Sequence, residues 1–326
     1  MHMSDALVSA PVAIGAGLAA ATLLVVAGKQ VAKKNDSSLT PLMGVLGAFV
    51  FASQMINFSI PGTGSSGHIV GGILLASILG PWAAFLTLVS VLIVQCLVFA
   101  DGGLMALGCN IINMAAFSCL VGYPLVFRPL IKTDPSFGRI SFAAIASSVV
   151  SLELGAVGVT AETELSGITA LPTVEFLMFM TPIHLAIGIC EGVATAGILY
   201  FVNRYRPALL QCNKKSVHTS SRKTRTALIA FAIGALLLGG CFSFIASSSP
   251  DGLEWSIAKV NNGNTELPIR SKVIAGADAV HNKVAIMPDY ESPLSGIVGT
   301  ILTLSLLWSL SSIIVSRRKA RRSIDK

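Results

Sequence analysis

Long apolar runs separated by short polar stretches make up most of this sequence. A helix needs about 20 predominantly apolar residues to cross a bilayer. The pattern predicts nine candidate spans, at residues 6–28, 39–58, 67–80, 82–100, 103–127, 140–160, 173–202, 226–247 and 294–315. The third is short, and the glycine-rich residues 61–67 before it predict an irregular loop. Irregular backbone is tolerated at membrane depth only where protein buries it or where it lines a cavity.

The composition supports a membrane protein and excludes several other classes. Of 326 residues, 53% are hydrophobic and 12% are charged, whereas a soluble domain carries roughly 25% charged residues. This excludes an ordinary soluble enzyme, a disordered protein and a nucleic-acid-binding domain. Thirty glycines and an aromatic content of 7% favour closely packed helices over a β-barrel. The expected fold class is all-α, a polytopic membrane helix bundle.

The positions of the basic residues predict an orientation. Most of the 23 lysines and arginines fall in four clusters between apolar runs, at 29–34, 128–139, 204–225 and 317–326. Such clusters mark the cytoplasmic side of a membrane. With nine spans, the N-terminus is then outside and the C-terminus cytoplasmic, with residues 161–172 and 249–293 outside. The net charge of +7 therefore belongs to cytoplasmic loops, and no nucleic-acid partner is expected.

The basic, polar stretch 206–225 divides the chain into two modules. A seven-span region, 1–205, precedes it, and a two-span module with a long extracytoplasmic loop, 226–326, follows it. No basic residue precedes the first apolar run, so we expect that run to be retained rather than cleaved as a signal peptide. The six cysteines include no CxxC pair, so neither a disulfide framework nor a thiolate metal site is expected.

The first two residues offer a possible metal chelate. A histidine at position 2 is expected to protect Met1 from removal, which leaves a free α-amine, the backbone amide nitrogen of His2 and its imidazole. These nitrogens can bind one divalent ion through fused rings. A tetragonal nitrogen set points to Ni(II) or Cu(II), with Co(II) also possible. His68 follows a flexible glycine-rich loop on the same predicted side, and it could supply a fourth nitrogen.

Other interpretations of these residues remain open at this stage. A histidine at position 2 is often incidental, and His68 could be an ordinary hydrogen-bonding residue. Ionisable groups inside spans are functional candidates by default, so Glu153, His184 and Glu191 could instead carry protons or ions in a secondary transporter or channel. Buried hydrogen bonding explains them equally well. A structural or signalling membrane protein without a substrate is a third possibility.

Further polar and small residues predict packing within the bundle. Two glycine pairs, Gly67 with Gly71 and Gly188 with Gly192, have the GxxxG spacing of closely packed helices. Asn110 and Asn113 are expected to be structural or to orient a ligand histidine. The remaining histidines, His218 and His281, are expected to be solvent-exposed.

Several short segments then carry a resemblance to a known family. They are Met1-His2 with Asp5; QMINF at 54–58; GSSGHIVGG at 64–72; FADGG at 99–103 with ALG at 106–108; Asn110 and NMA at 113–115; and PIH at 182–184 with Gly188, Glu191 and Gly192. Over about residues 1–205 the chain resembles the CbiM/NikM family, the substrate-binding components of energy-coupling-factor transporters for nickel or cobalt. Residues 250–254 read PDGLE and 287–291 read MPDYE. They resemble the two-span NikN or CbiN component, here fused behind the first.

The resemblance implies a metal site and a set of partners. Its ligands would be the amine of Met1, the amide and imidazole of His2, and His68. Surrounding or structural roles would fall to Asn57, Ser66, Asn110, His184 and Glu191. The ion would be Ni²⁺ or Co²⁺, bound as substrate and not as a cofactor, with a link to cobalamin biosynthesis.

The same resemblance places the protein in a transport complex. It implies a bacterial or archaeal cytoplasmic membrane, with a transmembrane coupling subunit and cytosolic ATPases as partners. The sequence contains no GxxxxGK[ST] motif, so we expect ATP hydrolysis in the partner subunits and no enzymatic activity here. Met3, Ser4, Ala6 and Ser59 depart from the family pattern, which affects the pose of the N-terminal segment and the loop before His68. The ligands do not choose between nickel and cobalt.

Overall fold

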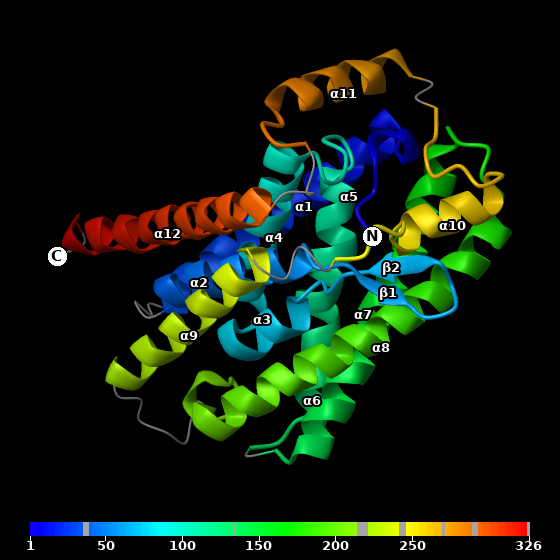
Figure 1. Cartoon of the computed structure of the whole chain (residues 1–326). Coiled ribbons are helices and arrows are strands. Elements are labelled where there is room, and N and C mark those ends of the chain that lie inside the picture. Colours follow the sequence, from blue (N-terminus) through cyan, green and yellow to red (C-terminus); the bar gives the residue numbers. More distant parts are fainter. Residues whose placement is uncertain are drawn as a thin grey trace.

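The computed structural model describes residues 1–34, 39–133, 135–213, 221–240, 246–268, 271–288 and 293–324. It is a helix bundle with one small hairpin, which confirms the predicted all-α membrane class (Figure 1). The helices are η1 (Asp5–Leu7), α1 (Ala10–Lys34), α2 (Leu39–Gln54), α3 (Gly72–Leu79), α4 (Pro81–Phe99), α5 (Leu107–Asn110), the π-helical η2 (Ile111–Phe127), α6 (Arg128–Leu130), α7 (Phe137–Ser166), α8 (Thr173–Tyr205), η3 (Pro207–Leu209), α9 (Ser221–Gly240), α10 (Gly252–Val260), α11 (Lys272–Val284) and α12 (Pro293–Ile324). Strands β1 (Phe58–Ile60) and β2 (Ser65–Gly67) pair antiparallel.

Five helices of the described chain are long and apolar enough to cross a membrane. They are α1, α4, the continuous helix Leu107–Leu130, α7 and α8, while shorter apolar helices cover Leu39–Gln54, Thr226–Gly240 and Leu294–Leu310. The third candidate span, 67–80, contains a helix even shorter than its length predicts. Only α3 is helical there, and its eight residues extend about 12 Å at 1.5 Å per residue. All of them are buried, so α3 is an interior half-helix behind a loop.

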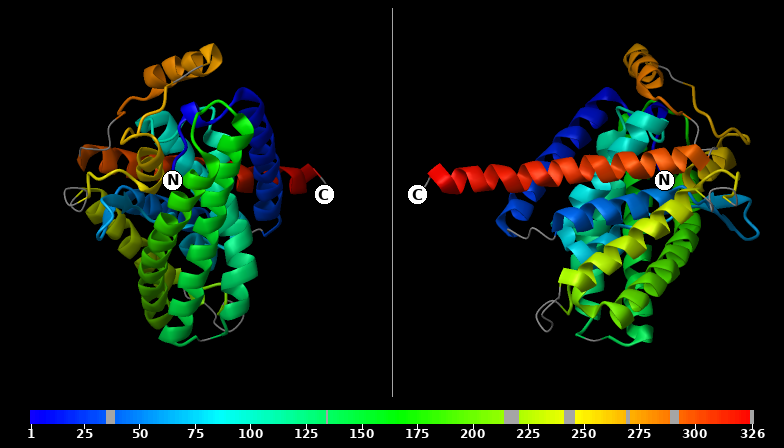
Figure 2. Two further views of the ribbon diagram at one scale, coloured as in Figure 1. Left: turned by 90° about the vertical axis from the view of Figure 1, so that its right-hand side faces the viewer. Right: turned by 60° about the vertical axis from the view of Figure 1, so that its left-hand side comes forward.

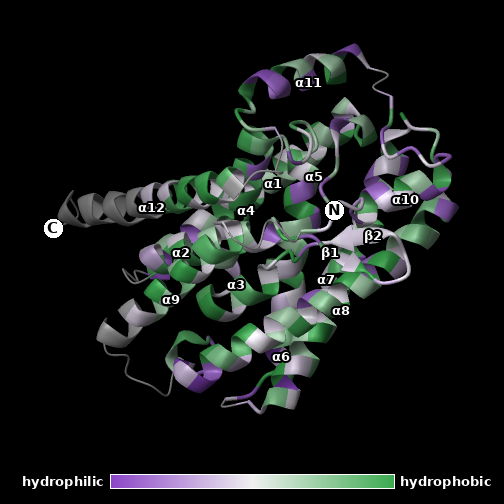
Figure 3. Ribbon diagram, viewed as in Figure 1, coloured by the Kyte–Doolittle hydropathy of each residue, from purple (hydrophilic) through white to green (hydrophobic). Residues whose placement is uncertain are grey.

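The outer surface of the bundle is apolar. Large side chains on α1, α7 and α8 are more than half exposed, including Ile14, Leu18, Phe142, Val193 and Phe201. Figure 3 shows hydrophobic residues along much of α7 and α8. An exterior of this kind suits contact with lipid, because a bilayer core imposes no cost on exposed apolar groups. Helix α4, in contrast, is buried on most of its faces and packs against α2, α3, η2 and α12.

One of the two predicted glycine pairs packs helices together. A Cβ atom at Gly188 would lie 2.9 Å from Cα of Val149, and one at Gly192 would collide with the backbone of Ile145. Both neighbours are on α7, so α7 and α8 pack backbone to backbone. The prediction for Gly67 and Gly71 is wrong, because these residues end β2 and precede α3 instead of lying on one helix.

The irregular segment between β2 and α3 is anchored by buried side chains. The carboxylate of Glu191, on α8, accepts hydrogen bonds from the amides of Val70 (2.9 Å) and Gly71 (3.0 Å). Gln54 donates to the carbonyl of Val70 at 2.8 Å and accepts from Gln95 at 2.7 Å. Side chains of the protein therefore make the hydrogen bonds that the backbone of this loop needs, in a place where water is not available to make them.

The C-terminal module wraps onto the first module. Helices α9 and α12 pack against α2 and each other, and α10 lies against α8 and β2. The polar stretch 249–293, predicted as a loop, contains two helices, α10 and α11. Figure 2 shows α12 extending away from the bundle to the C-terminus. The five described cysteines are free. Cys241, His218 and residues 289–291 of the second motif lie outside the described residues.

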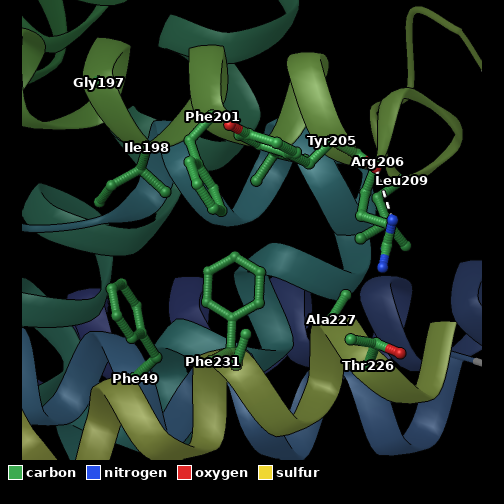
Figure 4. A pocket seen from close by; sticks show the side chains of 12 residues that line it. Phe49, Gly197, Ile198, Phe201, Tyr205, Arg206, Leu209, Thr226, Ala227 and Phe231 are labelled. Carbon is green, nitrogen blue, oxygen red and sulfur yellow. Dashed lines mark hydrogen bonds between the residues drawn. The ribbon is translucent and has the colours of Figure 1, made fainter. Parts of the chain in front are cut away.

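A crevice of about 500 Å³ separates the end of α8 from α9 (Figure 4). Most of its lining is apolar, with the rings of Phe49, Phe201, Tyr205 and Phe231 and the backbone of Gly197 among its walls. None of the predicted ligand residues lines it.

The glycine contact between α7 and α8 predicts an effect on stability. Gly192→Ala should destabilise the protein by about 1–3 kcal/mol, since the added methyl group overpacks a backbone contact. Gly197→Ala is a matched control on the same helix, because nothing lies within 4 Å of its Cβ position. The control should be neutral or stabilising by up to about 1 kcal/mol. Thermal unfolding in detergent measures both, and equal midpoints for the two variants would contradict the packing described.

The Glu191 anchor predicts a second difference. Glu191→Ala should lower the thermal midpoint, because it leaves two buried amides unpaired at about 1–3 kcal/mol each. Glu153 on α7 is the matched control, because its Oε1 atom is buried with no hydrogen-bond partner among the described residues. Glu153→Ala should therefore cause no loss. If Glu153→Ala lowered the thermal midpoint as much as Glu191→Ala, the hydrogen bonds of Glu191 to the loop would not explain the loss of stability.

Candidate metal site

The N-terminal segment is held inside the bundle by its own backbone. The amide of Met3 donates to Oδ1 of Asn110 at 2.8 Å, and the carbonyl of Met3 accepts from the amide of Gly103 at 2.8 Å. Two residues later, Oδ1 of Asp5 accepts from the amide of Ala106 at 2.9 Å. A side chain at Gly103 would collide with Asp5, so the glycine allows this close approach. These contacts fix the position of the two residues that precede Met3.

The structure brings His2 and His68 together. Their imidazole rings are stacked, with centroids 5.3 Å apart and planes inclined by 23°. Both are buried, with 7% of the His2 side chain exposed and 9% of the whole His68 residue exposed. The β1–β2 hairpin brings His68 to this place, since the chain terminus lies beside the hairpin and α10 (Figure 1).

The two rings differ in their hydrogen-bond partners. Nδ1 of His2 lies 3.2 Å from Oδ1 of Asp101, and Nδ1 of His68 lies 3.1 Å from the carbonyl of Ile69. Nε2 of His2 is buried. Burial, with the nearby N-terminal charge, lowers the pKa of His2 to about 3 and the pKa of His68 to about 4. Both rings are neutral at pH 7, and the neutral imidazole is the form that binds metal.

The N-terminal amine forms an ion pair with the C-terminal module. The nitrogen of Met1 lies 2.5 Å from Oδ2 of Asp251, and 3% of the Met1 side chain and 18% of the Asp251 side chain are exposed. Burial raises the pKa of Asp251, but the charge of the ammonium group and its hydrogen bond outweigh this and hold that pKa below its usual value. The N-terminus of the first module thus contacts the C-terminal module directly.

Asp251 is held in place by the helix that it begins. Its Oδ1 atom accepts from the amides of Leu253 (2.9 Å) and Glu254 (2.8 Å), and Glu254 accepts in return from the amide of Asp251. This reciprocal pair is a capping box, which satisfies amides that α10 leaves unbonded at its start.

The remaining residues of the PDGLE segment fit it against the first module. The carbonyl of Pro250 accepts from the amide of Ser66 at 2.8 Å. A Cβ at Gly252 would lie 3.1 Å from Cε1 of His184, so only glycine fits without displacement. Leu253 is buried. The segment therefore lies directly over the hairpin and the two stacked histidines.

The other predicted residues surround this site in different ways. Ser66 contacts the PDGLE segment, Asn110 holds Met3, and Glu191 anchors the loop after His68. The carbonyl of Asn57 accepts from the amide of Ser247 at 2.8 Å. Nδ1 of His184 lies 2.7 Å from the carbonyl of Met180, and its Nε2 is buried without a partner among the described residues.

The prediction that His281 is solvent-exposed is wrong. His281 is 4% exposed and its Nε2 lies 2.7 Å from the carbonyl of Cys96, because α11 covers the bundle there.

Two acidic residues that the sequence did not single out, Asp101 and Asp251, contact the predicted ligands. Their signal was present, since they lie in the FADGG and PDGLE segments.

The described residues contain no group of three or more His, Cys, Asp or Glu side chains with metal-binding spacing. The predicted ligand set does not require one, because two of its four nitrogens belong to the backbone. What the geometry provides is a buried cluster of one amine and two neutral imidazoles.

Comparisons with known proteins identify the family of each module. Residues 2–209 match the family model described as cobalt uptake substrate-specific transmembrane region, and residues 225–316 match the PDGLE domain. A putative fused nickel transport protein NikMN from Archaeoglobus fulgidus is 32% identical, over 95% of this chain and 98% of its own length. A probable fused nickel transport protein LarMN from Lactiplantibacillus plantarum is also 32% identical, over 72% and 71%.

A solved structure is similar as well. The crystal structure of a truncated transition metal transporter superposes with a TM-score of 0.54 at 32% identity, over 63% of this chain and 99% of that one. The chain therefore belongs to the family of the cobalt uptake substrate-specific transmembrane region, fused to a PDGLE domain.

Proposed function

We propose that this protein is the substrate-specific membrane subunit of an ATP-driven importer of Ni²⁺ or Co²⁺. Transport of nickel or cobalt through a membrane component follows from the family and from its named relatives. The finer proposal is that the ion binds to four nitrogens: the amine of Met1, the amide and imidazole of His2, and the imidazole of His68.

One observation carries this proposal. The terminal amine and the two imidazoles are buried next to one another, although His2 and His68 are 66 positions apart in sequence. The amide nitrogen of His2 lies between its amine and imidazole, so these three donors close a five-membered and a six-membered ring around one ion. The six-membered ring uses Nδ1, the ring nitrogen nearer the backbone. In the structure Nδ1 faces Asp101, and metal binding would replace that contact.

The carboxylate route through Glu153, His184 and Glu191 has less support. Both oxygens of Glu191 already accept backbone amides from the loop after His68, which gives this residue a structural task. Nδ1 of His184 faces a helix carbonyl, as buried histidines in helices commonly do.

The choice between nickel and cobalt does not follow from these ligands. A planar nitrogen set accepts both ions, and the usual affinity order places Ni²⁺ above Co²⁺ and Cu²⁺ above both. Metal analysis of protein purified after equal supply of nickel and cobalt would decide which ion it carries.

We also propose that the N-terminus lies outside and the C-terminus inside the cytoplasmic membrane, next to a coupling subunit and cytosolic ATPases. The basic clusters support this orientation. A fluorescent protein fused after Lys326 should fluoresce, and alkaline phosphatase fused there should be inactive. The opposite result would place the C-terminus outside.

The N-terminal chelate predicts strict dependence on the first two residues. His2→Ala should abolish stoichiometric nickel or cobalt binding, because it removes one ligand and one chelate ring. Adding Met-Gln ahead of Met1 should do the same, since it moves the histidine to position 4. A single added residue is a poorer test, because a histidine at position 3 itself chelates through two amides and the amine.

The matched control is a two-residue extension after Lys326, which should leave binding unchanged. Mass spectrometry of each purified variant should first determine its N-terminal residue. Isothermal titration calorimetry with nickel then measures binding. Unchanged binding in both N-terminal variants would rule out the chelate.

A further inference from the structure

We propose that Asp251 of the PDGLE segment is the counter-ion and positioning residue of the metal complex. The inference rests on the proposed N-terminal chelate. It gives the C-terminal module a defined task, which is to supply the carboxylate that holds the metal-binding amine in place.

The first support is that the two oxygens of this carboxylate have different partners. Oδ1 accepts two amides at the start of α10, while Oδ2 contacts the nitrogen of Met1. The capping box fixes Oδ1, and Oδ2 therefore occupies a fixed position over the amine. Pro250 and Trp255 attach the same segment to the hairpin, through the amide of Ser66 and the carbonyl of Thr63.

The second support is charge complementarity. Without metal, the ammonium group of Met1 carries one positive charge opposite the one negative charge of Asp251. When a divalent ion binds, one proton leaves the ammonium group and one leaves the amide of His2, both to water. The ion with one deprotonated amide again carries one positive charge. Asp251 therefore matches this positive charge in both states, so the buried amine and its metal complex are both compensated. Asp101, whose side chain is 26% exposed, adds a second negative charge next to His2.

The third support is hydrogen-bond geometry. An amine bound to a metal keeps two N–H groups, so it can continue to donate to Oδ2 of Asp251. Groups that accept hydrogen bonds from metal ligands orient those ligands and strengthen the site. Asp101 differs from Asp251 in this respect, because it faces Nδ1 of His2, the nitrogen that the metal itself would occupy.

The test uses the full-length protein, purified metal-free in detergent, with NiCl₂ as the probe. Asp251→Asn removes the charge but retains the cap, because Asn and Asp are about equally good at the N-terminus of a helix. We expect Ni²⁺ binding to weaken roughly 10- to 100-fold, as is typical for loss of such a partner. The absorption band of square-planar nickel should keep its wavelength at saturation, because the four nitrogens are unchanged.

Two further variants separate the counter-ion from folding of the segment. Glu254→Gln removes the other carboxylate of the segment and keeps the capping box, since Gln serves at that position too; it should bind nickel like the parent protein. Asp251→Ser keeps a capping side chain without charge and should match Asp251→Asn. Thermal midpoints identify any variant whose weakened binding comes from unfolding.

The outcomes distinguish this inference from the proposed function. Parent-like nickel affinity in Asp251→Asn and Asp251→Ser, with binding still abolished by the Met-Gln extension, overturns the role of Asp251 alone. Nickel binding that survives the extension overturns the chelate, and the counter-ion with it. An equal loss of affinity in Glu254→Gln shows that only the fold of the segment matters, and this also overturns the inference.

Discussion

The site depends on one constraint, which is that irregular backbone inside a membrane protein must find its hydrogen-bond partners within the protein. Two irregular segments meet here, the N-terminal residues before α1 and the loop between β2 and α3. Asn110 and Gly103 satisfy the first at Met3, and Glu191 satisfies the second at Val70 and Gly71. Because these partners are buried and fixed, the segments carry His2 and His68 to one place.

Close helix packing makes those partners available. Glu191 and Gly192 are neighbours on α8, and Gly192 lets the backbone of α8 approach that of α7. Gly155 on α7 leaves room for the side chain of Met1, whose sulfur would lie 2.8 Å from an added Cβ. Small residues thus have two tasks, since they join helices and also make space for a chain terminus inside the bundle.

The C-terminal module adds contacts to the candidate metal site from a distant part of the sequence. Its PDGLE segment contributes a carbonyl to the hairpin, a carboxylate to the terminal amine and a glycine that fits against His184. Each contact needs a different property of the segment, and together they place α10 over the stacked histidines.

Much of the fold followed from the sequence, because the length and hydropathy of a membrane helix are local properties. The apolar runs predicted the long helices α1, α4, α7 and α8. Residue type, position and the family resemblance together gave the candidate ligands Met1, His2 and His68. The hairpin and the two helices at 252–284 were not predicted, and the short candidate span at 67–80 did not show that only α3 is helical there. Tertiary contacts, and not a local pattern, hold these segments. Only the tertiary structure showed that Asp101 and Asp251 face the candidate ligands, because contacts across 250 positions of sequence depend on how the modules pack and not on any local pattern.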